Sequence, residues 1–335
     1  MNKYKPKNIL VTGGAGFIGC NYVRYMLAND KGIEIINLDK LTYAGSLDNL
    51  SDLADEPRHH FIQGDICDRT LVKQLLQQYN IDTIVHFAAE SHVDRSLSGP
   101  AEFITSNIIG TFTLLEAARE FWLQDKGLDE SQCRFHHIST DEVYGTLGAD
   151  DKAFAETTAY EPNSPYSASK AGSDHLVRAW HHSYGLPVTT SNCSNNYGPY
   201  QNAEKFIPTV IAACQKQTRI PVYGDGSNIR DWLYVEDHCS GIDVVVRNGT
   251  IGETYNIGGN NEWANIAICG VICDLMDRRA VTAVPHRQLI EFVTDRPGHD
   301  WRYAVDSAKI SKKLNWQPQE TFESGIVKTL DWYCR

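Results

Sequence analysis

The chain has 335 residues, a length at which one large core or two interleaved domains are expected. Hydrophobic residues make up 42% and charged residues 22%, as in ordinary globular proteins, and the formal net charge is -11. This charge argues against a nucleic-acid-binding surface, although it leaves room for a local basic pocket. No apolar stretch is long enough to span a bilayer, and the basic N-terminus leads into a short apolar run rather than a signal peptide.

The nine cysteines are odd in number and scattered, and none forms a C-x-x-C pair. Cys269 and Cys273 are one helical turn apart, but no histidine or cysteine partner has the spacing of a metal site. We therefore expect buried free thiols in a reducing cytoplasm and no bound metal.

Apolar runs alternate with helical patterns through the first half of the chain. Strands are expected at residues 8–12, 34–38, 60–63, 83–88, 135–139 and 188–192. Helices are expected at residues 17–28, 71–79, 103–122 and 166–183. Near-continuous apolar strands separated by helices indicate a parallel sheet that is covered on both faces.

The second half is less regular. Short apolar runs at 221–223, 232–235 and 254–257 alternate with helical patterns at 206–216, 266–276 and 322–334. Proline and glycine cluster at 197–200, 223–226 and 295–298, which indicates loops that could hold substrate groups. We predict a first domain over 1–193, joined by about 232–258, and a smaller, interleaved α/β substrate domain that is formed mainly by 194–335.

Three glycines with G-x-x-G-x-x-G spacing, Gly13, Gly16 and Gly19, follow the first predicted strand and open the first helix. Such a turn brings a pyrophosphate against the backbone and the helix N-terminus. Asp39 ends the next strand about twenty residues on, where a carboxylate accepts bonds from ribose hydroxyls and repels a 2′-phosphate. The pattern predicts a Rossmann-type doubly wound sheet that binds NAD rather than NADP. The alternative is a glycine turn that serves packing only.

A tyrosine and a lysine lie four residues apart at the start of the helix from residue 166. Ser164 suits the helix N-cap and Pro165 the first helical position, so Tyr166 and Lys170 share one helix face. A phenol is a weak base at its usual pKa of about 10. A nearby ammonium group favours phenolate and lowers that pKa, so the pair suits oxidation of a hydroxyl group.

Thr140, Asp141 and Glu142 follow the predicted strand 135–139. Two neighbouring carboxyl groups suit the removal of water, with one as acid and the other as base. Adjacent side chains on a strand point to opposite sides, so both reach one substrate only if the strand ends or twists here. The alternative is an acidic pair at a solvated strand end.

This combination resembles the extended short-chain dehydrogenase/reductase family over essentially the whole chain. Further stretches carry the resemblance: AAESHVDRS at 88–96, SNNYGPY at 194–200, IRDWLYVEDH at 229–238 and DRPGHD at 295–300. Members of this family include nucleotide-sugar epimerases, decarboxylases and dehydratases. Thr140, Asp141 and Glu142 look like the signature of the dTDP-glucose 4,6-dehydratases, which implies oxidation at sugar C4, elimination of water across C5–C6 and reduction at C6. A non-catalytic NAD-sensing module is the alternative from another class, but it would be expected to lack Tyr166 or Lys170.

The resemblance also implies site residues and partners. The implied catalytic residues are Thr140, Asp141, Glu142, Tyr166 and Lys170. The implied NAD-binding residues are Gly13, Gly16, Phe17, Ile18, Gly19, Asp39, Lys40, Leu41, Thr42, Asp65, Ile66, Phe87, Ala88, Ala89, Ser91, Ser106, Tyr166, Lys170 and Asn196. The implied substrate-binding residues are Ser91, Thr140, Asn195, Lys205, Phe206, Pro221, Tyr223, Arg230, Asn265, Arg296 and His299. The expected partners are dTDP-glucose and a second copy of the chain, which would pair helices 103–122 and 166–183.

Four positions depart from the family pattern. Ser106 stands where threonine is typical, Trp263 and Ala264 replace more polar residues before Asn265, and Trp301 stands where a basic residue is frequent. These departures concern the pocket for the nucleotide base rather than the reaction.

Overall fold

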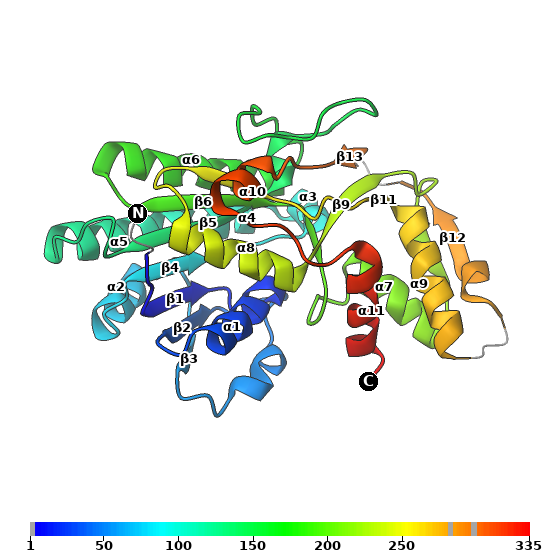
Figure 1. Cartoon of the computed structure of the whole chain (residues 1–335), viewed down its shortest axis with the longest axis horizontal. Coiled ribbons are helices and arrows are strands. Elements are labelled where there is room, and N and C mark those ends of the chain that lie inside the picture. The colour runs from blue at the N-terminus through cyan, green and yellow to red at the C-terminus, as the bar shows by residue number, and fades with distance from the viewer. Residues whose placement is uncertain (1–3, 281–283, 296–299) are drawn as a thin grey trace.

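The computed structural model describes residues 4–280, 284–295 and 300–335 (Figure 1). Seven strands, all parallel, form the central sheet in the order β10-β6-β5-β4-β1-β2-β3. Their bounds are β1 Asn8–Thr12, β2 Glu34–Asp39, β3 His59–Gln63, β4 Thr83–His86, β5 Arg134–Thr140, β6 Val188–Cys193 and β10 Thr254–Ile257. This is the doubly wound Rossmann-type order, so the predicted fold class is confirmed.

Helices cover both faces of this sheet. One face carries α1 (Phe17–Asn29), α8 (Val235–Asn248) and α10 (Ala308–Leu314), and the other carries α2 (Arg69–Gln78), α5 (Thr111–Ala118) and α6 (Pro165–Tyr184). Side chains of β1 alternate between the two cores: Ile9 and Val11 pack with α1, whereas Leu10 packs on the opposite side. Burial on both faces explains why the strands are apolar throughout.

The helix expected at 103–122 is a chain of shorter segments. After α3 (Val93–Ser98) come α4 (Pro100–Phe103), the π-helical η2 (Ile104–Gly110), α5 and the π-helical η3 (Arg119–Asp125). The buried side chain of Asn107 in η2 accepts a hydrogen bond from Glu90 N (2.8 Å) and donates to Ser169 Oγ (2.8 Å). The helix thereby holds the loop after β4 against α6.

A second, smaller group of elements has its own core, seen at the right of Figure 1. Its strands are β7 Asn195–Tyr197, β8 Ile220–Tyr223, β9 Ile229–Tyr234, β11 Glu262–Ala264, β12 Ile290–Val293 and β13 Arg302–Tyr303. Its helices include α7 Phe206–Lys216, α9 Asn265–Arg279 and α11 Phe322–Tyr333.

Short 3₁₀ segments in the described chain are η1 Leu47–Leu53 and η4 Asp141–Tyr144, between elements of the central sheet, and η5 His286–Leu289. The division into domains 1–193, joined by 232–258, and 194–335 stays our proposal.

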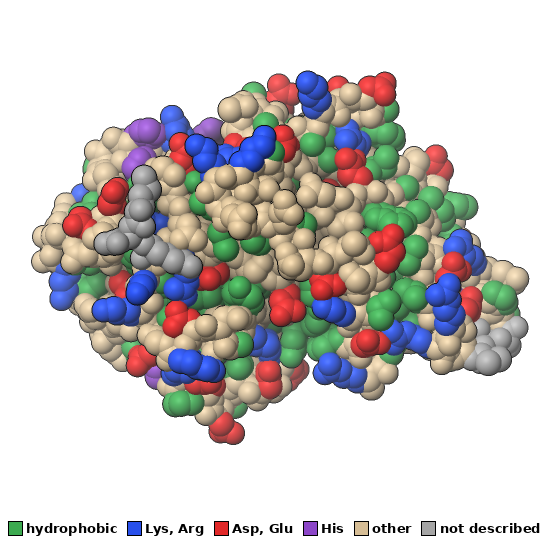
Figure 2. Space-filling model, viewed as in Figure 1, with side chains coloured by type: hydrophobic (Ala, Val, Ile, Leu, Met, Phe, Trp, Pro, Cys, Tyr) green, Lys and Arg blue, Asp and Glu red, His purple; other side chains and the backbone are tan. Residues whose placement is uncertain are grey.

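The surface view gives no sign of a charged stripe. On the face drawn in Figure 2, acidic and basic side chains are interspersed over both groups of elements. Within the described ranges, no helix is long and apolar enough to cross a membrane.

Candidate active site

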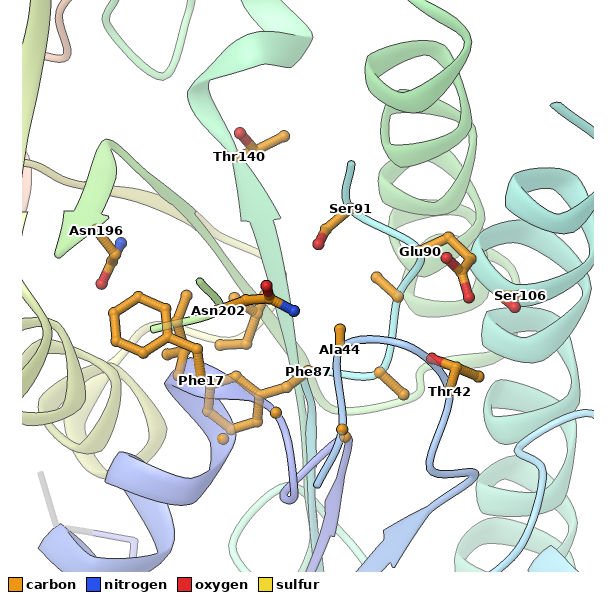
Figure 3. Close-up of a pocket in the computed structure, with 18 of the residues that line it drawn as sticks. Phe17, Thr42, Ala44, Phe87, Glu90, Ser91, Ser106, Thr140, Asn196 and Asn202 are labelled. Atoms are coloured by element: carbon orange, nitrogen blue, oxygen red, sulfur yellow. The ribbon is translucent and has the colours of Figure 1, made fainter. Parts of the chain in front are cut away.

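A cavity of about 300 Å³ opens at the carboxyl ends of the central strands. It lies where the loops after β1 and β4 diverge to opposite faces of the sheet, the usual ligand position in a doubly wound fold. Figure 3 shows its walls: Phe17 at the start of α1, Thr140 at the end of β5, and Asn196 from the second group of elements.

The glycine turn at one wall depends on the absence of side chains. Gly13 has φ of 73°, and a Cβ atom there would lie 2.7 Å from Cα of Ala88 in the loop after β4. A Cβ on Gly19 would lie 2.3 Å from the carbonyl oxygen of Gly13. Helix α1 then begins with Gly16 as an extended N-cap that offers no side-chain cap. The residues at this end of α1 line the cavity and no side chain caps them, so the helix N-terminus suits a phosphate group.

Asp39 ends β2 at the rim of the cavity. Its Oδ2 accepts a hydrogen bond from Ala15 N (2.9 Å), and its Oδ1 accepts one from Leu41 N (2.8 Å). Burial raises the pKa of this carboxyl group, and the two amide donors oppose that rise. Lys40 beside it forms an ion pair with Asp65 across 2.9 Å, which links the ends of β2 and β3.

Strand β5 ends at Thr140, and the chain turns at once into η4. Thr140 has an extended backbone, and its Oγ1 accepts a weak bond from Glu142 N (3.3 Å). The change from strand to 3₁₀ geometry removes the strict alternation of side chains, so Asp141 and Glu142 both line the cavity.

Asp141 is only 2% exposed. Burial raises the pKa of its carboxyl group well above the ordinary value, and the nearby charges of Glu142 and Asp231 raise it further, against Arg230. Its Oδ2 atom is buried without a hydrogen-bond partner within the described ranges. A carboxyl group whose pKa is raised and whose second oxygen has no protein partner within the described ranges is suited to donate a proton to a ligand.

Helix α6 begins as expected, with Pro165 in its first turn and a capping box between Ser164 and Ser167. Its first turns bring Tyr166 and Lys170 to the cavity. Lys170 Nζ donates a hydrogen bond to the Ile138 carbonyl oxygen (2.8 Å), and burial lowers its pKa. Burial also raises the pKa of Tyr166 well above its usual value, helped by Glu142 and opposed by a bond to Thr140. The sequence predicted that Lys170 lowers the Tyr166 pKa; among the protein groups, burial of the phenol dominates and the pKa is raised instead.

The opposite wall comes from the second group of elements. Asn195 and Asn196 lie in β7, and His238 Nδ1 lies 2.9 Å from Asn196 Oδ1, which fixes that amide. Lys205 Nζ donates to the carbonyl oxygen of Ser91 (3.3 Å), so this lysine joins the two sides of the cavity.

The cavity brings together most, but not all, of the predicted residues. All five predicted catalytic residues line it, as do all the predicted NAD-binding residues except Leu41. Among the predicted substrate-binding residues, Ser91, Thr140, Asn195 and Lys205 line it, whereas Phe206, Pro221, Tyr223, Arg230 and Asn265 do not. Arg230 is buried and donates to the carbonyl oxygens of Ile229, Asp300 and Trp301. Arg296 and His299 lie outside the described residues.

The cavity also has lining residues that the sequence analysis missed. They are Tyr43, Ala44, Gly45, Glu90, Ser194, Gln201, Asn202 and Glu204 among others. Most of them continue a segment of predicted site residues, after Thr42, Ala89 or Tyr200, and Ser194 directly precedes Asn195. Their position beside predicted site residues was therefore the signal that could have identified them, because their residue types form no motif.

A doubly wound sheet with a glycine turn at its switch point and a Tyr–Lys pair in the same cavity defines a short-chain dehydrogenase/reductase of the extended type. A family model described as GDP-mannose 4,6 dehydratase matches residues 10–329. The chain is 56% identical to a dTDP-glucose 4,6-dehydratase of Neisseria meningitidis serogroup B, over 98% of this chain and 93% of that protein. It is 54% identical to one of Salmonella typhimurium, over 97% and 92%. The chain belongs to the dTDP-glucose 4,6-dehydratase family.

A solved structure of this family is also similar. The dTDP-glucose 4,6-dehydratase DesIV of Streptomyces venezuelae, solved with NAD and TYD bound, matches with a TM-score of 0.88 and 44% identity. The match covers 98% of this chain and 97% of that one.

Proposed function

We propose that the chain converts dTDP-glucose to dTDP-4-keto-6-deoxyglucose with tightly bound NAD. The observation that carries this proposal is the buried Asp141 beside Thr140 and Glu142, in one cavity with Tyr166 and Lys170. An enzyme that only oxidises or epimerises has no need of a neutral acid and a second carboxyl group next to its Tyr–Lys pair.

The lining residues fit NAD. At Gly13 and Gly19 the turn has no room for side chains, and the uncapped N-terminus of α1 lines the site, which suits a pyrophosphate. Asp39 suits the ribose hydroxyls and would repel a 2′-phosphate. NAD bound there would supply the hydride acceptor and donor that the side chains lack, for oxidation at C4 and reduction at C6.

The chain's own residues handle the protons. Tyr166 removes the proton of the C4 hydroxyl group, and Thr140 donates a hydrogen bond to the same oxygen. The C4 ketone acidifies the C5 proton, which Glu142 removes as general base and returns to C5 when C6 is reduced. Asp141 protonates the departing C6 hydroxyl group. Its raised pKa favours the protonated form that this step needs. Lys170 stabilises the Tyr166 phenolate and holds the nicotinamide ribose.

The diphosphate and nucleotide lie, in this proposal, towards the second group of elements. Asn195 and Lys205 line the cavity on that side and would bind the diphosphate. Arg230 is held by backbone carbonyl groups, so it would reach the substrate only if these bonds exchange. Phe206, Pro221, Tyr223, Asn265, Arg296 and His299 stay predictions for the nucleotide end.

The deciding experiment is incubation of the enzyme with dTDP-, UDP-, CDP- and GDP-hexoses, with the products read by mass spectrometry. We expect dTDP-glucose to lose one water. Loss of carbon dioxide would indicate a decarboxylase, an isomer of unchanged mass would indicate an epimerase, and no product with any sugar would favour an NAD-sensing module.

We also propose a homodimer. Leu97, Ile104, Ile109, Phe112 and Tyr184, on segments α3 to α5 and on α6, are each at least 42% exposed. Such a cluster of exposed apolar side chains on neighbouring helices suits burial against a second copy. We expect Phe112→Asp to give monomers by sedimentation analysis, while Phe292→Asp, at an exposed side chain of β12, leaves the oligomeric state unchanged. A wild-type monomer would refute the proposal.

The nine cysteines are all free thiols, and eight of them are buried or partly buried. This supports the expected place of the enzyme in a reducing cytoplasm.

A further inference from the structure

A buried carboxyl group lies directly behind the catalytic pair. Asp174 stands one helical turn after Lys170 in α6 and is only 6% exposed. Its Oδ2 accepts hydrogen bonds from Ser139 Oγ (2.7 Å) and Tyr160 OH (3.0 Å). Its Oδ1 lies 3.1 Å from Nε2 of His137. Asp174 does not line the cavity, and the reaction proposed above leaves it without a role.

These contacts join the two elements that carry the reacting groups. Ser139 is in β5 and immediately precedes Thr140, so its bond to Asp174 ties the end of that strand to α6. Asn192 of β6 extends the network, because its Nδ2 donates to Tyr160 OH (3.1 Å). The distance between the acid pair and the Tyr–Lys pair therefore depends in part on this carboxyl group.

Asp174 also supplies a negative charge near a buried cation. Lys170 is 4% exposed, and within the described ranges the hydrogen bond of its Nζ goes to a neutral group, the Ile138 carbonyl. Burying an ammonium group without a counter-charge is costly. The charges of Asp174 and Lys170 each favour the ionised form of the other. Burial raises the pKa of Asp174 to about 6, so the group is still a carboxylate at neutral pH.

The other titratable neighbours do not supply this counter-charge. His86 in β4 and His137 in β5 have pKa values lowered well below the ordinary value by burial, so they are neutral. Burial raises the pKa of Cys193 in β6 and of Tyr160, so these groups are neutral as well. His175 follows Asp174 in α6, and a positive charge there would only favour the Asp174 carboxylate.

We infer that Asp174 is a positioning residue of the reaction, whose carboxylate keeps Lys170 charged and holds the end of β5 against α6. Lys170 in turn stabilises the phenolate of Tyr166, so Asp174 acts on the oxidation step through Lys170. The inference rests on the proposed function, because that function gives Tyr166 and Lys170 their roles.

The experiment compares Asp174→Asn with the wild type in a single turnover of dTDP-glucose across pH, with NADH absorbance as the signal of C4 oxidation. Without the carboxylate, Lys170 loses charge and the phenolate of Tyr166 loses support. We expect the acid limb of the pH–rate profile to move to higher pH by about one unit. The rate of NADH formation at neutral pH should then be roughly tenfold lower. An ultraviolet difference titration of the NAD-loaded enzyme, with Tyr166→Phe as blank, should show the same shift in phenol ionisation without turnover.

Two further variants keep the test decisive. Tyr160→Phe removes one donor from the carboxylate and should shift the limb in the same direction by less, even if Asp174→Asn fails to fold. Ser173→Ala is the matched control, because this buried serine contacts Lys170 O and His137 but makes no hydrogen bond to Asp174. The inference is wrong if folded Asp174→Asn, or Tyr160→Phe where that variant alone folds, leaves the limb unmoved. A wild type that forms no NADH with dTDP-glucose would instead refute the proposed function.

Discussion

Thr140 Oγ1 lies 3.3 Å from Oδ1 of Asp141, while Oδ2 of the same carboxyl group is buried and makes no hydrogen bond to the described residues. One oxygen is thus oriented by the residue before it, and the other is left for a ligand. Burial and the neighbouring acids raise the pKa of this carboxyl group well above its ordinary value, which favours the protonated form that a general acid needs.

Asp141→Asn should separate oxidation from dehydration. The amide keeps the size of the side chain but has no acidic proton, so NADH should still form while loss of water slows by roughly 10²–10⁴-fold. Rapid-quench mass spectrometry should then detect the 4-keto-hexose that has kept its C6 hydroxyl group. Asp151→Asn, at an exposed position, is the control and should match the wild type. Dehydration at the parental rate in Asp141→Asn would contradict the acid role.

Tyr166→Phe should abolish the first step. Without the phenol there is no base at the C4 hydroxyl group, so single-turnover NADH formation should fall by roughly 10²–10⁴-fold. Tyr144→Phe is the matched control: this buried tyrosine donates to Asn256 Oδ1 (2.9 Å) and does not line the cavity. It should lower the free energy of unfolding by about 1 kcal/mol and leave oxidation nearly intact. Equal losses of rate in both variants would point to packing rather than to base catalysis.

The sequence predicted the elements that repeat a strong local pattern and missed those that depend on distant contacts. The strands of the central sheet were found because burial on both faces makes them apolar throughout. Helix α8 was missed because it begins at Val235, directly after Tyr234 of β9, with no loop to mark the change. Asp174 carries no sequence signal of its own, since its partners Ser139, near the end of β5, and Tyr160, in the segment before α6, reach it only in the folded chain. Burial likewise decides the pKa of Tyr166, and a sequence motif does not contain burial.

Asp39→Asn should weaken the preference for NAD over NADP. The carboxylate now accepts two backbone amides and, in the proposed complex, the ribose hydroxyls, so NAD affinity of the cofactor-free enzyme should fall about tenfold. Loss of the negative charge should at the same time improve NADP binding. Calorimetric titration with both cofactors measures the ratio, and Asp48→Asn, an exposed acid in η1, serves as the control. An unchanged ratio of affinities would remove Asp39 from cofactor selection.

The buried histidines should make folding stability depend on pH below about 6.5. Burial lowers the pKa of His238 to about 3, and His86, His136 and His137 are also shifted well downward. The unfolded chain therefore binds protons that the folded chain excludes, so stability is present above the unfolded pKa and is lost as pH falls below it.

Each such histidine contributes a slope of about 1.4 kcal/mol per pH unit to the free energy of unfolding. Asp174 and Asp141 act in the opposite direction, because burial raises the pKa of Asp174 to about 6 and that of Asp141 well above its ordinary value, so the folded chain binds these protons first. Between the unfolded carboxyl pKa of about 4 and pH 6, the proton bound by folded Asp174 offsets the pH slope of about one histidine. Urea unfolding at several pH values between about 5 and 7 should show the net loss of stability on the acid side. His238→Gln should reduce the slope by about one histidine's share, whereas His182→Gln, at an exposed position, should leave it unchanged. If the free energy of unfolding has the same pH slope in the wild type and in both variants, His238 is protonated in the folded enzyme despite its burial, and the prediction is wrong.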